Sequence, residues 1–161
     1  MSDNNYMTFN RILVPFDNSE LSYKAVDQAI ELATEELTQI FILYVINEIP
    51  LPIHFSKIEQ KKDIVVISPL ANQVYNEVKQ EMIPILDNLK KGNNKSNIVV
   101  ATEIRIGDPA EIIVDFAKHE KIDLIVMGSI GHKGFAGMFR RLGSVARKVA
   151  EEVTSPVFIV R

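Results

Sequence analysis

Short apolar runs alternate along the chain with longer stretches in which apolar residues recur every three or four positions. A run that is apolar at successive positions is typical of a strand buried on both faces of a parallel sheet. A spacing of three to four residues is typical of a helix with one buried side. The apolar runs predict strands at 11–16, 39–46, 98–104, 123–127 and 157–161.

The segments between these runs predict helices, and one of them begins at a clear capping sequence. Asp108 is suited to accept a hydrogen bond as the N-cap, Pro109 fits the first turn, and Glu111 completes a capping box. A turn at 17–20 marks the start of the first helix. The helical spacing covers the segments 21–37, 70–89, 109–119 and 142–154.

Alternating strands and helices predict one α/β domain over residues 1–161, with a five-stranded, mainly parallel open sheet and helices on both faces. We expect residues 1–10 to form a loose lead-in and 47–68 a long loop, a lid or a linker. Ligands of such sheets bind at the carboxyl ends of the strands where the strand order reverses. We expect the first and fourth strands to be neighbours there, which places Asp17 and Gly128 across one crevice.

A glycine-rich segment follows the fourth strand and leads into the last helix. Glycines let the backbone approach an anion closely and adopt positive φ, and a helix N-terminus adds unpaired N–H donors. Between Ser129 and Ala150 there is no Asp or Glu, although the whole chain has a formal charge of −3. The segment therefore predicts a phosphate site, and the alternative is a surface loop with solvated charges. Its basic residues are Lys133, Arg140, Arg141, Arg147 and Lys148, next to His132.

Composition excludes several classes of site. The chain has 47% hydrophobic and 24% charged residues, which is typical of a globular domain. It has no cysteine, so disulfides and thiolate metal sites are excluded, and its histidines share no metal-ligand spacing. The acidic balance argues against nucleic-acid binding, and no apolar run has membrane-spanning length. We expect a cytoplasmic protein.

Three motifs resemble the universal stress protein family, in the family's order and on the expected elements. They are the segment 12–20, the Gly-Asp-Pro-Ala turn at 107–110, and the stretch from Met127-Gly128-Ser129 to Gly143-Ser144-Val145. The resemblance extends from about Arg11 to Arg161. It implies a Rossmann-like fold of the adenine nucleotide α-hydrolase type, and usually a homodimer.

The Gly-x-x-Gly sequence with a later Gly-Ser pair is similar to the ATP-binding branch of that family. This similarity implies that Asp17 meets the ribose or adenine, that Val45 contacts adenine, and that Ser144 reaches a terminal phosphate. Mg²⁺ or Mn²⁺ would be held through the phosphates. The implied nucleotide-binding residues are Pro15, Asp17, Val45, Met127, Gly128, Ser129, Gly131, Gly143, Ser144 and Val145.

The loop departs from the family pattern in two ways. The stretch between Gly131 and Gly143 is two residues longer, and Ile130 stands where many relatives carry a polar residue. Either the loop closes around phosphates with a bulge, or ATP binds weakly and another nucleotide fits. The choice among ATP, ADP, AMP and a cyclic nucleotide stays open.

No sequence motif predicts efficient catalysis. The chain lacks the Gly-x-x-x-x-Gly-Lys-Ser/Thr sequence of P-loop enzymes, and no nucleophile–base pair stands at a motif. We therefore predict an ATP-binding sensor or switch in stress response. The alternatives are a slow ATPase or nucleotidyl transferase, and a dimeric interaction module that has lost nucleotide binding.

The last apolar run bears on assembly. Residues Val157 to Val160 are apolar, and we expect them at a sheet edge. Exposed apolar edges invite pairing with another chain. We therefore expect an isologous homodimer across these strands.

Overall fold

The computed structural model describes residues 8–33, 37–49, 69–131 and 142–161. Most of the expected long loop lies outside these ranges, as do the basic residues His132, Lys133, Arg140 and Arg141 of the glycine-rich segment.

The described residues form one sheet in the order β3-β2-β1-β4-β5, and every pairing between these strands is parallel. The sequence prediction of five strands and the adjacency of the first and fourth are thus confirmed. The order reverses between β1 and β4, which is where a ligand crevice is expected. The strands are β1 (Arg11–Phe16), β2 (Thr38–Asn47), β3 (Ile98–Gly107), β4 (Leu124–Gly128) and β5 (Val157–Val160).

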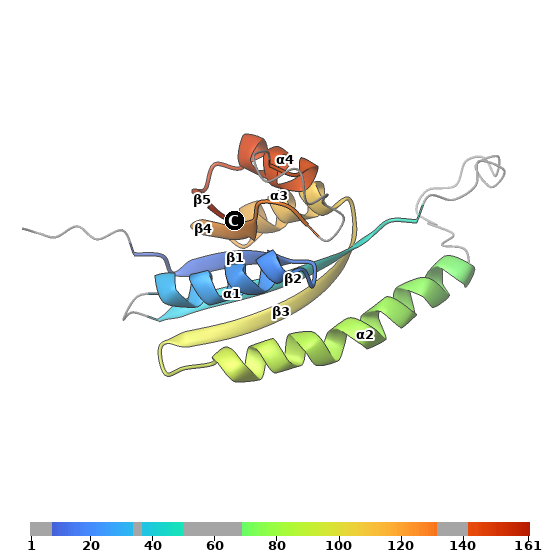
Figure 1. Cartoon of the computed structure of the whole chain (residues 1–161), viewed down its shortest axis with the longest axis horizontal. Coiled ribbons are helices and arrows are strands. Elements are labelled where there is room, and N and C mark those ends of the chain that lie inside the picture. The colour runs from blue at the N-terminus through green and yellow to red at the C-terminus, as the bar shows by residue number, and fades with distance from the viewer. Residues whose placement is uncertain (1–7, 34–36, 50–68, 132–141) are drawn as a thin grey trace, which may run out of the picture.

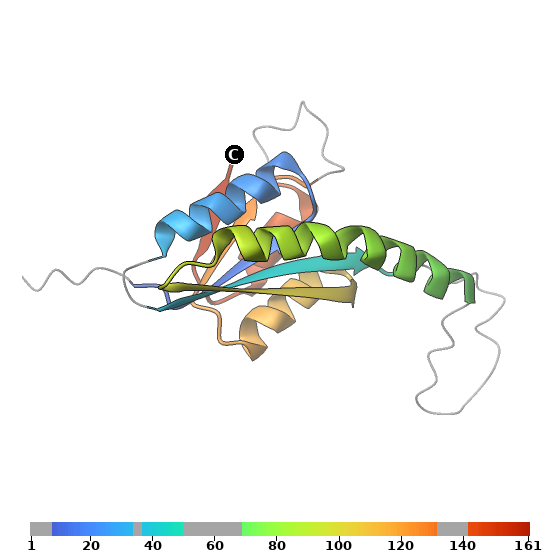
Figure 2. The ribbon, with the colours of Figure 1, turned by 90° about the horizontal axis from the view of Figure 1, so that it is seen from below.

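Four helices in the described ranges cover the two faces of the sheet (Figure 1). Figure 2 shows α1 and α2 on one face and α3 on the other, and α4 packs beside α3. None of these helices is long and apolar enough to cross a membrane. The helices are α1 (Glu20–Leu32), α2 (Pro69–Asn93), α3 (Pro109–His119) and α4 (Ser144–Glu152).

Two helices are shorter than the spacing predicts. Helix α1 ends at Leu32 although the helical spacing continues to Leu37, and α4 ends at Glu152. Leu37 is exposed and lies next to the first residue of β2, so its agreement with the helical period was coincidental.

Alternate residues of the central strands supply two separate cores. Ile12, Val14 and Phe16 of β1 are buried under α1 and α2, whereas Leu13 faces α3 and α4. Each such side chain contributes roughly 1.5–3 kcal/mol when fully buried. The helices are therefore held on both faces, and the carboxyl ends of β1 and β4 remain in fixed relation to each other.

Strands β2 and β3 extend beyond β1 at the carboxyl end of the sheet. The register of β1 with β2 ends at Phe16 and Tyr44, whereas β2 and β3 remain paired for three further positions, to Asn47 and Gly107. Figure 2 shows this projecting pair of strands below α2. We call the six residues Val45–Asn47 and Arg105–Gly107 the projecting ribbon; it stands on the β2 side of the switch point.

At the amino ends of the strands, Arg11 links β1 to neighbouring elements through hydrogen bonds. Its guanidinium donates to the carbonyl and carboxylate of Glu120, at 2.6 and 2.7 Å, and to Gln39 at 2.8 Å. The Asp123 carboxylate accepts from the backbone N–H of Arg11 and of Asn10. These bonds join β1 to the start of β4 at the end of the sheet away from the crevice.

Candidate functional site

A tight turn after β1 fixes the position of Asp17. Asn18 has a φ of 64°, and Ser19 is the N-cap of α1, accepting from the N–H of Ser22. Asp17 Oδ1 accepts from Ser19 N at 3.1 Å and from Ser19 Oγ at 2.5 Å. The Tyr23 hydroxyl donates to Asn18 Oδ1 at 2.8 Å. The carboxylate of Asp17 is thus oriented by its neighbours.

Glycines at the end of β4 and in the segment that follows it allow the backbone to approach this turn and the start of α1 closely. A Cβ at Gly131 would lie 2.5 Å from Asp17 Oδ2, and one at Gly128 would lie 2.9 Å from Leu21 Cβ. The expectation of positive φ is wrong at these positions, because only Gly107 among the described glycines has a positive φ. Space is therefore what requires glycine at Gly128 and Gly131.

The two ends of the glycine-rich segment meet in a backbone hydrogen bond. The N–H of Gly143 donates to the carbonyl of Ser129 at 2.8 Å, and Gly143 is the N-cap of α4. Ser144 is the first helical residue, and its side chain is exposed. Gly143 supplies no side-chain cap, so no cap side chain takes the N–H donors of the first turn of α4, and such donors suit an anion.

Ser129 is a buried polar residue at the same place, with 9% of its surface exposed. Its N–H donates to the carbonyl of Val160 at 2.8 Å, while no described residue is a hydrogen-bond partner of its hydroxyl. A buried hydroxyl without a partner costs free energy unless a ligand or water satisfies it. Ser129 therefore fits a site for a polar ligand.

The other expected site residues differ in what they offer a ligand. Met127, only 4% exposed, and the half-buried Val145 pack in the core under α3 and α4, so their side chains serve packing. Pro15 lies inside β1, in register with Leu43. Val45 is half-buried on the projecting ribbon. The structure thus brings Asp17, Gly131, Ser129 and Gly143 together directly, and places Val45 one strand away.

One residue beside the crevice was missed from the sequence. Tyr44 is the register partner of Phe16, at the end of β1, and is half-buried. Burial, with smaller contributions from the carboxylates of Asp17 and Glu81, raises the pKa of the Tyr44 phenol. The phenol therefore stays protonated, as a neutral group, at ordinary pH. Tyr44 could not be identified as a site residue from the sequence, because it lies within an apolar run and the sequence does not show that β1 ends beside it.

The positive charge of Lys148, in the basic stretch that includes the last helix, is paired with two carboxylates at the start of α3. Its Nζ lies 3.1 Å from Glu111 Oε1 and 3.6 Å from Asp108 Oδ1, so Lys148 joins α4 to the start of α3. The predicted N-cap is confirmed, since Asp108 accepts from the N–H of Glu111 at 3.0 Å, whereas the Glu111 carboxylate accepts from Lys148. That backbone hydrogen bond is the main cause that lowers the pKa of Asp108, and the charge of Lys148 adds to it.

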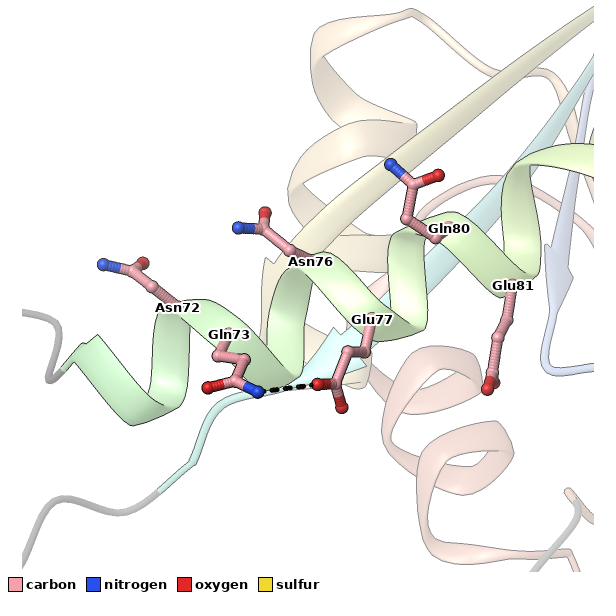
Figure 3. Close-up of a pocket in the computed structure, with 6 residues that line it drawn as sticks. All are labelled: Asn72, Gln73, Asn76, Glu77, Gln80 and Glu81. Atoms are coloured by element: carbon pink, nitrogen blue, oxygen red, sulfur yellow. Dashed lines mark hydrogen bonds between the residues drawn. The ribbon is translucent and has the colours of Figure 1, made fainter.

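A separate surface hollow of about 760 Å³ runs along α2 and has a different chemistry. Figure 3 shows two rows of polar side chains along its helix, and Gln73 donates to Glu77 at 3.0 Å. The described lining includes two carboxylates and no Lys or Arg, a charge that disfavours phosphate, so we do not place the candidate site there. The hollow is lined by Asn72, Gln73, Asn76, Glu77, Gln80 and Glu81.

The described residues contain no group of three His, Asp or Glu side chains that could hold a metal ion.

Comparison with known proteins gives a consistent result over the whole domain. A family model described as the universal stress protein family matches residues 8–161. Universal stress protein YxiE of Bacillus subtilis is 36% identical over 153 residues, covering 95% of this chain and 99% of that relative. The solved structure of MJ0577 from Methanocaldococcus jannaschii is 27% identical with a TM-score of 0.78, and covers 96% of each chain.

Two more distant solved structures are described with nucleotides. A universal stress protein in complex with cAMP has a TM-score of 0.63 at 23% identity, over 96% of this chain and 99% of that one. A universal stress protein from Archaeoglobus fulgidus in complex with dAMP has a TM-score of 0.57 at 18% identity, over 96% and 100% of the two chains. These two likenesses concern the fold.

Proposed function

The chain belongs to the universal stress protein family, and from that premise we propose that it binds ATP in the crevice between β1 and β4. Nucleotide occupancy would change a surface that a partner protein recognises. The protein would act in the cytoplasm as a nucleotide-dependent sensor or switch of a stress response.

One observation carries the proposal. Segments far apart in the sequence converge on one small region: the Asp17 turn, the Gly131 backbone, and the Ser129–Gly143 hydrogen bond at the start of α4. Free N–H donors at a helix start and close backbone approach suit a phosphate. The carboxylate of Asp17 suits a ribose hydroxyl, because an ionised carboxylate accepts hydrogen bonds from hydroxyl donors.

The nucleotide complexes of relatives support an adenine nucleotide. The cAMP and dAMP complexes show that this fold accepts an adenine base and at least one phosphate in other members. For this chain we propose ATP as the nucleotide, with Mg²⁺ or Mn²⁺ held through its phosphates. The Ser144 hydroxyl, exposed at the first turn of α4, would contact the terminal phosphate.

The test begins with the purified protein. Nucleotide released by denaturation is identified by chromatography, and affinities for ATP, ADP, AMP and cAMP are measured by calorimetry on nucleotide-free protein. We expect ATP to bind and Asp17→Ala to weaken it by about tenfold or more, because a hydrogen bond to a charged group contributes about 1.5–3 kcal/mol. The matched control is Asp27→Ala, which removes an exposed carboxylate from α1, the helix that follows the Asp17 turn. Failure of all four nucleotides to bind would reject the proposal.

We further propose that the dimer forms through β5. This strand pairs only with β4 in the described sheet, and Phe158 on it is 40% exposed. An apolar sheet edge is stabilised by pairing with a second copy. Light scattering should give twice the chain mass for the natural protein and the single mass for Phe158→Glu. A monomer at micromolar concentration for the natural protein would contradict this proposal and leave nucleotide binding unaffected.

A further inference from the structure

The projecting ribbon has two faces of different character. Ile104 and Ile106 of β3 pack with Ile46 and Tyr75 beneath α2. Because successive residues of a strand point to opposite faces, Glu103 and Arg105 lie on the other face. That is the face on which Val45 packs toward the core under α3 and α4.

Arg105 is the direct neighbour of Val45 on this face. The two residues are register partners in the parallel pairing of β2 with β3. Adjacent strands lie about 4.8 Å apart, so side chains from partnered positions stand next to each other. A planar group resting on Val45 is therefore within reach of the Arg105 side chain.

The guanidinium of Arg105 is held in place and still accessible. It forms an ion pair with Glu103, two residues earlier on the same strand and face. Its side chain nevertheless remains 54% exposed, so the guanidinium is accessible to a ligand. An arginine held by a carboxylate loses little further freedom when it stacks on an aromatic ring.

We infer that Arg105 is a base-recognising residue of the nucleotide site, stacking its guanidinium on a purine that rests against Val45. This inference rests on the proposed function and adds to it the residue that sets the base preference. A purine has a larger ring face than a pyrimidine, so stacking favours adenine nucleotides over cytidine nucleotides. Glu103 is a positioning residue, because it acts only by holding the guanidinium.

The test compares two triphosphates that differ only in the base. Dissociation constants for ATP and CTP are measured for the natural protein, Arg105→Met, Arg105→Lys and Glu103→Gln. Methionine keeps an unbranched apolar stem and removes the cation. We expect Arg105→Met to weaken ATP by about tenfold, the range of a partly desolvated cation–π contact, and to weaken CTP by less, because its ring face is smaller. Lysine keeps the charge without the planar group, so its ATP affinity should be intermediate, as should that of Glu103→Gln.

A control variant that removes a different positive charge distinguishes base stacking by Arg105 from general electrostatic attraction of the phosphates. Lys118→Met removes one positive charge from the last turn of α3 and should leave both constants unchanged. If Arg105→Met weakens ATP and CTP equally, or leaves the ATP preference intact, the inference is overturned while nucleotide binding stands. If the natural protein binds neither triphosphate, the proposed function itself fails. Melting curves of each variant show that the comparison is made on folded protein.

Discussion

Gly131→Ala is expected to weaken nucleotide binding sharply while leaving the fold intact. The added Cβ would lie 2.5 Å from Asp17 Oδ2, and ordinary contact begins at 3.4 Å, so one of the two groups must retreat by roughly 0.9 Å. Asp17 resists because its other oxygen is bonded to the N–H and hydroxyl of Ser19. Overpacking of this kind costs about 1–3 kcal/mol. If this cost is incurred when the nucleotide binds, the affinity for the nucleotide falls by about five- to 150-fold.

Calorimetric titration with ATP gives the loss, and thermal unfolding shows whether the fold is retained. The matched control is Gly92→Ala in α2, where the new Cβ would have no atom within 4 Å. That control should keep full affinity and gain up to about 1 kcal/mol of stability, because alanine is the better helix former.

A double-mutant cycle tests the cause. In an Asp17→Ala background the clash partner is absent, so Gly131→Ala should cost little further affinity. Equal losses with and without the Asp17 carboxylate would refute the reasoning from this contact, as would an unchanged affinity of the single variant.

Two stability predictions concern residues outside the crevice. Asp108→Ala should lower the free energy of unfolding by about 1 kcal/mol at neutral pH, the usual value of an N-cap. Because the N–H of Glu111 lowers the pKa of Asp108, the stabilisation is complete above the ordinary pKa of 3.8 and is lost as pH falls through the lower pKa of the folded state. Urea titrations from pH 7 to 2.5 should therefore show the free energies of unfolding of the natural protein and the variant converging. A difference that stays constant with pH would contradict the assignment. Arg11→Met should lower the free energy of unfolding by about 1–3 kcal/mol, because the Glu120 and Gln39 acceptors lose their donor. The affinity for ATP should stay unchanged, because Arg11 lies at the end of the sheet away from the crevice. A loss of affinity would contradict this separation of the two ends.

Local structure was predictable where neighbouring residues alone decide it. The Asp108-Pro109 start of α3 was predicted because a cap, a proline and the third-residue amide interact within one turn. The strands were predicted because both faces of a central strand are covered, which leaves an apolar run in the sequence. The end of α1 was misjudged because Leu37 matched the helical period by chance.

Details of the site depended on groups that the sequence does not bring together. Serine is favoured at the N-cap position, yet Gly143 rather than Ser144 takes that position in α4 and donates to Ser129 across the glycine-rich segment. Tyr44 was read as an ordinary strand residue, and its closeness to Asp17 depends on where β1 ends relative to β2.

The sequence by itself determined the order of strands and helices, the capped helix start at Asp108, and the resemblance that directs attention to a nucleotide. These follow from short-range periodicity and from motifs, both of which are contiguous in the chain. Only the tertiary structure decided that Gly131 must lack a side chain because Asp17 occupies the space, and that Arg105 stands beside Val45. Both relations join residues far apart in sequence, and they are set by sheet order and register, which arise from packing the whole domain.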